Sequence, residues 1–83
     1  MAPVQVSPDT PSVRASAREL GGAVYVIAVN AGTAPASVTL TEPSLGDRTA
    51  YVVGSPQTVT AQNGALAVTL PPLTAQIYVA PPA

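Results

Sequence analysis

Short runs of alternating apolar and polar residues, separated by turn signals, constrain the fold of this chain most strongly. Residues 13–18 alternate between Val or Ala and Arg or Ser, and this period of two is typical of a half-buried strand. Gly21-Gly22 and Asn63-Gly64 favour two-residue hairpin turns, because their backbones reach positive φ at little cost. With turn signals at intervals of about 8–12 residues, the sequence predicts an all-β domain.

The predicted strands form one antiparallel β-sandwich. Parallel strands would need crossovers of about a dozen residues, and the segments between the alternating runs are shorter. Residues 23–29 are apolar at both parities, which predicts a central strand covered on both sides. We expect a two-sheet sandwich of seven to eight short strands with Greek-key or Ig-like connections. Its clearest strands are residues 13–18, 23–29, 37–41, 49–53, 57–61, 65–70 and 75–80.

Alternation within the strands also predicts which side chains face the core, since successive residues of a strand point to opposite faces. In residues 37–41 and 65–70, the larger apolar residues occupy one parity, and that parity is expected to point inward. The last strand is expected to place Ala75, Ile77 and Val79 inward, and Gln76, Tyr78 and Ala80 outward.

The chain is predicted to hold one domain between two Pro-containing ends. Residues 1–11 contain three prolines and read as a linker or a short edge segment, residues 12–80 form the sandwich, and residues 81–83 form a tail. No apolar run approaches the ~20 residues that cross a bilayer, so we expect no membrane partner. The first residues lack the basic and apolar regions of a signal peptide. If the parent protein is exported, we expect it to be extracellular or at the cell surface, with its signal peptide upstream of this sequence.

The side chains that carry most enzyme chemistry are missing. The sequence has no His and no Cys, its cations are three arginines, and its four carboxylates are scattered among predicted turns, linkers and strand ends. Acid–base and nucleophilic catalysis draw mainly on His, Cys, Lys and clustered carboxylates. We therefore expect a module without catalytic activity and without a cofactor. Three arginines are also too few for the basic footprint of a nucleic-acid-binding protein.

The low content of charged residues has two possible explanations. Charged residues make up 8% of the chain, whereas a soluble domain usually carries about a quarter. Part of the surface could be covered by another protein, which would remove the need for charge there. A GC-rich genome, which favours Ala, Pro, Val and Gly, would give the same composition. The sequence favours neither explanation over the other.

A longer pattern resembles a known family. Residues 18–30, RELGGAVYVIAVN, are similar to the opening of β-sandwich domains at the C-terminus of glycoside hydrolases, where the sandwich follows a (β/α)₈ catalytic barrel. The strand VTL at residues 38–40, the Asn63-Gly64 hairpin and the segment LPPLTAQIY at residues 70–78 continue the similarity. The resemblance covers about residues 12–80.

The resemblance implies a non-catalytic accessory domain of a glycoside hydrolase, which packs on a catalytic domain and stabilises it. The catalytic carboxylates of that family lie in the barrel, so no residue of this chain inherits them. We expect an apolar surface around Tyr25, Ile27 and Val29 to be the packing face.

Tyr25, Tyr51 and Tyr78 are the aromatic residues of the chain and its candidate carbohydrate or interface contacts. Two exposed tyrosines on one sheet face could stack against the rings of a polysaccharide. Alternatively, tyrosines bury their rings in a core or an interface and keep the hydroxyl at its rim. We favour packing over a sugar platform. By its parity, Tyr78 is the tyrosine expected to be most exposed.

Three further polar residues invite a ligand-binding interpretation. Asp9 and Asp47 could contribute to a calcium site, but calcium takes six to eight oxygen ligands and two distant carboxylates are a weak signal. Asn30 could contact a ligand, but an Asn beside a Gly more commonly bonds its own turn. Arg18 and its neighbour Glu19 are expected to be solvated charges at a sheet edge.

Two other functions stay open at this point. An independent carbohydrate-binding module would use Tyr78 or Tyr51 on polysaccharide. An Ig-like structural spacer of a bacterial surface or secreted protein would bind no ligand. The sequence does not reveal the sugar, the reaction of the parent enzyme or the oligomeric state.

Overall fold

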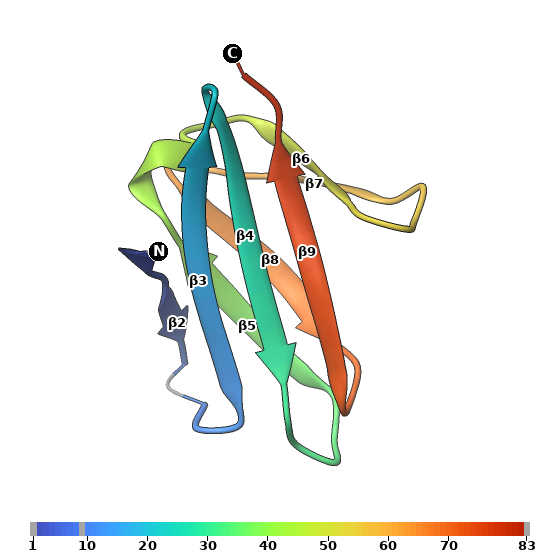
Figure 1. Cartoon of the computed structure of the whole chain (residues 1–83). Coiled ribbons are helices and arrows are strands. Elements are labelled where there is room, and N and C mark those ends of the chain that lie inside the picture. Colours follow the sequence, from blue (N-terminus) through green and yellow to red (C-terminus); the bar gives the residue numbers. More distant parts are fainter. Residues whose placement is uncertain (1, 9, 83) are drawn as a thin grey trace.

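The computed structural model describes residues 2–8 and 10–82 and shows two antiparallel sheets stacked as a sandwich (Figure 1). The larger sheet has the order β1 (Ala2–Pro3), β3 (Val13–Leu20), β4 (Ala23–Asn30), β9 (Thr74–Ala80), β6 (Thr49–Val52) and β7 (Thr58–Thr60). The smaller sheet has the order β2 (Gln5–Ser7), β5 (Ala36–Thr41) and β8 (Ala65–Leu70). In Figure 1, β5 and β8 run obliquely behind β3, β4 and β9.

The predicted fold class is confirmed. All strand pairs that the structure describes are antiparallel. Among these strands, β3–β4 and β6–β7 are the consecutive pairs that stay within one sheet, and the other connections cross between the sheets. Near the start of the chain, β1 pairs with β3 and β2 pairs with β5, so each lies at an edge of its sheet.

Both predicted hairpin turns have the backbone that their residues favour. Gly21 and Gly22 have φ of 61° and 85°, and Asn63 and Gly64 have φ of 52° and 81°. Two successive positive values define the type I′ turn, whose twist matches that of the flanking strands. The first turn joins β3 to β4, and the second leads into β8. The predicted turn cluster at residues 42–47 contains a short 3₁₀ helix, Pro43–Leu45.

The core lies between the two sheets and consists mainly of Val, Leu and Ala. Alternate residues of β4 face it, and Val24, Val26 and Ala28 are buried. Leu45 from the 3₁₀ turn is fully buried and joins the same cluster. The predicted inward parities of β5 and β8 are confirmed, since these strands bury Val38, Leu40, Leu66, Val68 and Leu70.

Asn30 is a fully buried polar residue whose side chain joins the loop after β4 to the end of β8. Its Oδ1 accepts a hydrogen bond from the Gly32 N–H at 2.9 Å, which confirms that the side chain bonds its own turn. Its Nδ2 lies 3.0 Å from the Ala34 carbonyl oxygen, 3.1 Å from that of Leu70 and 3.2 Å from that of Pro71. The loop after β4 is therefore joined to the end of β8.

The predicted orientation of the last strand is wrong. Tyr78 faces the core and is 3% exposed, whereas Ile77 points away from the core and is 38% exposed. In register, Tyr78 pairs with the core residue Val26, and Ile77 pairs with the half-exposed Ile27. Both parities of β9 carry large apolar residues, so its own sequence does not fix the orientation. Pairing with β4 fixes it.

The second correction concerns β4, which was expected to be covered on both sides. It is a central strand, with β3 on one side and β9 on the other. The smaller sheet covers one of its faces. On the other face Tyr25 and Ile27 are partly exposed and Val29 is 40% exposed. An apolar face of the sandwich is therefore left open.

Burial of Tyr78 has a measurable consequence at alkaline pH. Removal from water raises the pKa of the Tyr78 phenol above its usual value, because burial penalises the phenolate. Between the unfolded-state pKa of about 10 and the higher folded-state pKa, the folded chain holds more protons than the unfolded chain, so stability falls as pH rises. We expect denaturation midpoints to fall above about pH 10 and the fall to be smaller in Tyr78→Phe. Equal pH profiles for the two proteins would contradict this assignment.

Candidate functional site: the outer apolar face

The side of the larger sheet that points away from the smaller sheet is predominantly apolar. We call it the outer apolar face. Its apolar side chains come from β3, β4, β9 and the end of β6. They are Leu20, Tyr25, Ile27, Val29, Tyr51, Val53, Ile77 and Val79.

Strand register brings these residues side by side. Tyr25 on β4 lies opposite Val79 on β9, and Val79 lies opposite Tyr51 on β6. One row along the strands, Ile27 lies opposite Ile77. Neighbouring strands are about 4.8 Å apart, so side chains in register on one face touch. The eight residues therefore form one continuous surface.

Exposure varies within the outer apolar face. Leu20 is 60% exposed, Val53 is 52% exposed and Tyr51 is 45% exposed. Val79 is 5% exposed, because it lies between two tyrosines in the same row. Large exposed apolar side chains that form a contiguous patch are uncommon on monomeric domains and mark interaction surfaces.

A shallow depression lies at the β3 side of this face. It has a volume of about 500 Å³ and is lined by Arg18, Leu20, Tyr25, Ile27 and Ile77. Arg18 is the polar member of this lining, and it lies opposite Tyr25 in the β3–β4 pair. The depression can accept an apolar side chain of a partner next to a charged group.

The three predicted tyrosine contacts do not act together. Tyr25 and Tyr51 lie on the outer apolar face, separated by one strand. Tyr78, predicted as the most exposed tyrosine, is in the core and cannot contact a ligand on this face. Sequence analysis placed Ile77 and Val79 in the core, whereas both belong to the outer apolar face, where Ile77 is 38% exposed and its neighbours shield Val79. The available signal was that both parities of residues 75–80 carry large apolar side chains, so parity alone does not decide which row points inward.

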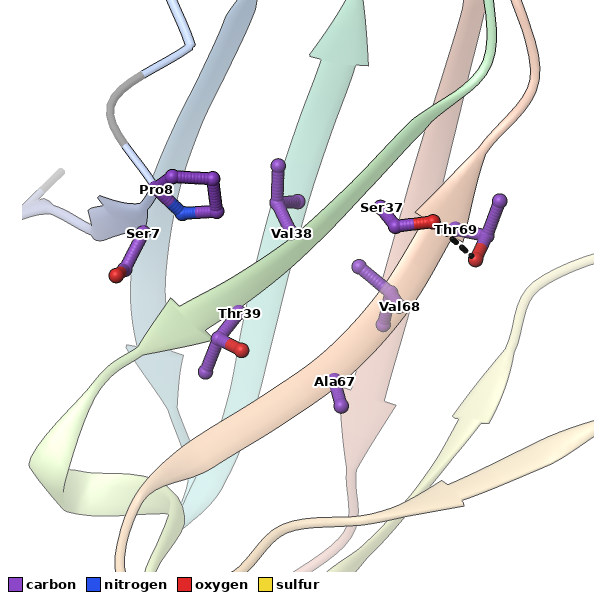
Figure 2. Close-up of a pocket in the computed structure, with 8 residues that line it drawn as sticks. All are labelled: Ser7, Pro8, Ser37, Val38, Thr39, Ala67, Val68 and Thr69. Carbon is purple, nitrogen blue, oxygen red and sulfur yellow. Dashed lines mark hydrogen bonds between the residues drawn. The ribbon is translucent and has the colours of Figure 1, made fainter.

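The outer side of the smaller sheet offers a second, different depression, shown in Figure 2. Its volume is about 280 Å³, and the hydroxyls of Ser37 and Thr69 lie 3.2 Å apart across the strand pair. The lining is uncharged and contains no aromatic ring: it consists of Ser7, Pro8, Ser37, Val38, Thr39, Ala67, Val68 and Thr69. Half of this lining consists of Ser and Thr, whose hydroxyls water solvates well, so this surface differs in character from the outer apolar face.

A metal site and a membrane-spanning helix each place specific requirements on the residues that the structure describes. Residues 2–8 and 10–82 contain no group of three His, Cys, Asp or Glu side chains that could hold a metal ion. Of the two carboxylates considered for calcium, Asp47 accepts a hydrogen bond from the Asn63 N–H at 2.9 Å, and Asp9 lies outside the described residues. Within the same ranges, no helix has the length and apolar character needed to cross a membrane.

Comparison with known proteins returned no relative: no protein-family model, curated protein or solved structure matches this chain. Its function is therefore inferred from its residues and their geometry.

Proposed function

We propose that this chain is a non-catalytic accessory domain of a glycoside hydrolase, and that its outer apolar face packs on a catalytic domain of the same polypeptide. The observation that carries the proposal is the continuous apolar surface over β3, β4, β9 and β6. The enzyme class comes from the resemblance of residues 12–80 to sandwiches that follow a catalytic barrel.

The energetics favour a covered face. Burying one Ile or Leu side chain contributes roughly 1.5–3 kcal/mol, and several such side chains are exposed on this face. An interface between two domains of one chain needs a less favourable binding free energy than an interface between separate proteins, because the linker keeps the two domains at a high effective concentration. A catalytic domain in the same polypeptide is therefore the partner that this face suits best.

The test uses the full-length polypeptide that contains this sequence. Ile27→Ser and Ile77→Ser together are expected to lower its inactivation temperature, because each removes a side chain buried between domains. In the isolated chain the same pair is expected to have a clearly smaller effect on the unfolding midpoint, since Ile27 and Ile77 are partly exposed there. Leu73→Ser is the control, because Leu73 is a loop residue that is 73% exposed and lies outside the face. No loss of thermal stability in the double variant would contradict the proposal.

A second candidate function is favoured by one specific observation. Tyr25 and Tyr51 lie in one row with β9 between them, so their strands are about 10 Å apart. Two tyrosines on a flat sheet face can stack against sugar rings of an extended polysaccharide. Titrating the ¹⁵N-labelled chain with soluble oligosaccharides distinguishes the two functions. Shifts centred on β4 and β6 that disappear in Tyr51→Ala would identify a carbohydrate-binding module. Unchanged spectra at millimolar sugar are the result that the packing domain predicts.

A further inference from the structure

Two arginines border the outer apolar face, and in the part of the chain that the structure describes neither has an acidic partner on this face. Arg14 and Arg18 are exposed on β3, and their register partners on β4 are Val29 and Tyr25. No hydrogen bond of either side chain is found among residues 2–8 and 10–82, whereas Arg48 donates to the Gly22 carbonyl oxygen at 2.9 Å. Arg14 and Arg18 are therefore charged groups available to a partner.

The carboxylates of the described residues lie away from these arginines or are already engaged. Glu42 Oε1 accepts hydrogen bonds from the backbone N–H and the hydroxyl of Ser44. Asp47 accepts from the Asn63 backbone. Glu19 follows Arg18 in β3, so its side chain points to the other face of the sheet. Counted over the described residues, the outer apolar face is positive, although the chain as a whole has a net charge of −1.

The positive charges of Arg14 and Arg18 disfavour one kind of partner for the outer apolar face and favour another. If two copies met face to face, four guanidinium groups would come together. The described residues of this face supply no carboxylate to neutralise them. Like charges that become desolvated in an interface oppose association. A partner that offers carboxylates next to an apolar centre would instead form charge-assisted, bidentate pairs with the arginines.

We propose that Arg14 and Arg18 select the partner of the outer apolar face: they oppose pairing of two copies of this chain and require a protein surface whose apolar centre is bordered by carboxylates. This inference rests on the proposed function, because it assumes that the face is covered by protein. Arg18 has the larger role, since it lines the depression together with Leu20 and Ile77.

The charge-reversed chain Arg14→Glu/Arg18→Glu supplies the stated partner chemistry, because it presents the same apolar centre with carboxylates at its border. Association of wild type, variant and an equimolar mixture is measured by sedimentation equilibrium at low and high salt. We expect the mixture to associate roughly 10-fold or more tightly than either protein alone at low ionic strength. We expect this preference to shrink in high salt, where exposed charges are screened.

Two further variants separate the effect of these arginines from net charge and from misfolding. Arg14→Ser/Arg18→Ser removes the repulsion without adding carboxylates, so it is expected to self-associate more tightly than wild type. The net-charge control places four carboxylates at exposed positions outside the face and is expected to show no preference for wild type. It carries Gln5→Glu, Ser37→Glu, Gln57→Glu and Gln62→Glu.

Three results would overturn the inference: a mixture no tighter than wild type alone, a preference that persists unchanged in high salt, or an equal preference in the net-charge control. Failure of the proposed function is a separate result. If Ile27→Ser/Ile77→Ser leaves the full-length polypeptide unchanged while the mixture still associates selectively, the catalytic-domain proposal is wrong and the charge selection holds.

Discussion

Asn30→Asp is expected to remove roughly 3–5 kcal/mol of folding free energy at neutral pH. The substitution puts a carboxylate where the Asn30 amide now lies close to three carbonyl oxygens. The side chain is fully buried, so water cannot relieve the repulsion. A domain of 83 residues has a total stability of about 4–12 kcal/mol, so this loss is a large part of it. Urea denaturation followed by circular dichroism measures the loss.

The pH dependence of this variant has a definite sign. Burial among carbonyl oxygens raises the pKa of the carboxyl introduced at position 30 above its unfolded value of about 3.9. The penalty is therefore largest at neutral pH and shrinks as pH falls toward 4, where the protonated carboxyl can donate one hydrogen bond. Gln57→Glu is the matched control, because it makes the same amide-to-carboxylate change at an exposed position. Similar losses in the two variants would contradict the role assigned to Asn30.

Gly64→Ala is the second substitution with a large expected effect. A Cβ at Gly64 would lie 2.8 Å from the Glu42 carbonyl oxygen and 2.9 Å from the Pro43 Cα, both of which are backbone atoms. Hydrogen bonds hold this approach in place, with Glu42 N–H donating to the Gly64 oxygen at 2.7 Å. A non-glycine residue at positive φ costs about 1–2 kcal/mol, and overpacking adds about 1–3 kcal/mol.

Gly54→Ala separates these two costs. Gly54 has a φ of 82°, close to the 81° of Gly64, but a Cβ at Gly54 would have no atom of another part of the chain within 4 Å. We expect Gly54→Ala to lose about 1–2 kcal/mol from the backbone alone and Gly64→Ala to lose clearly more. Equal denaturation midpoints for the two variants would show that the contact with residues 42 and 43 carries no energy.

Local sequence was enough to predict the fold class and the hairpins. The dipeptides Gly21-Gly22 and Asn63-Gly64 indicate their backbone conformation directly, because few residue pairs tolerate two positive φ values. Strands with polar residues at one parity, such as β3 and β5, also revealed their inward faces. In these segments the local pattern and the tertiary structure agree.

Tertiary pairing decided what the sequence left ambiguous. Ile77 and Tyr78 are both large and apolar, so the orientation of β9 depends on its register with β4. The short strands β1 and β2 fall in a Pro-rich segment without a period and exist because neighbouring strands offer them backbone partners. The outer apolar face could not be predicted as a unit, since it requires the register of β3, β4, β9 and β6. Tyr25 and Tyr51 were predicted as candidates, but their common row was not.

The low content of charged residues can be related to one face of the structure. The exposed side of β4 and β9 consists of Tyr, Ile, Val and Ala, and the two charged side chains of this face are both on β3. A surface of this composition is poorly suited to permanent contact with water. This distribution agrees with the proposal that the face is covered by a partner, as opposed to a composition bias that would act evenly on all faces.

The most direct test of the covered face is tyrosine nitration of the isolated chain and of the full-length polypeptide that contains it, with the modified residues identified by mass spectrometry. Tyr51 is the reporter, because it is 45% exposed on the face, and Tyr78 is the internal control, because it is buried in the core. We predict that Tyr51 reacts in the isolated chain and becomes protected in the full-length polypeptide, while Tyr78 stays unreactive in both. Equal reactivity of Tyr51 in the two proteins would contradict a partner on the outer apolar face.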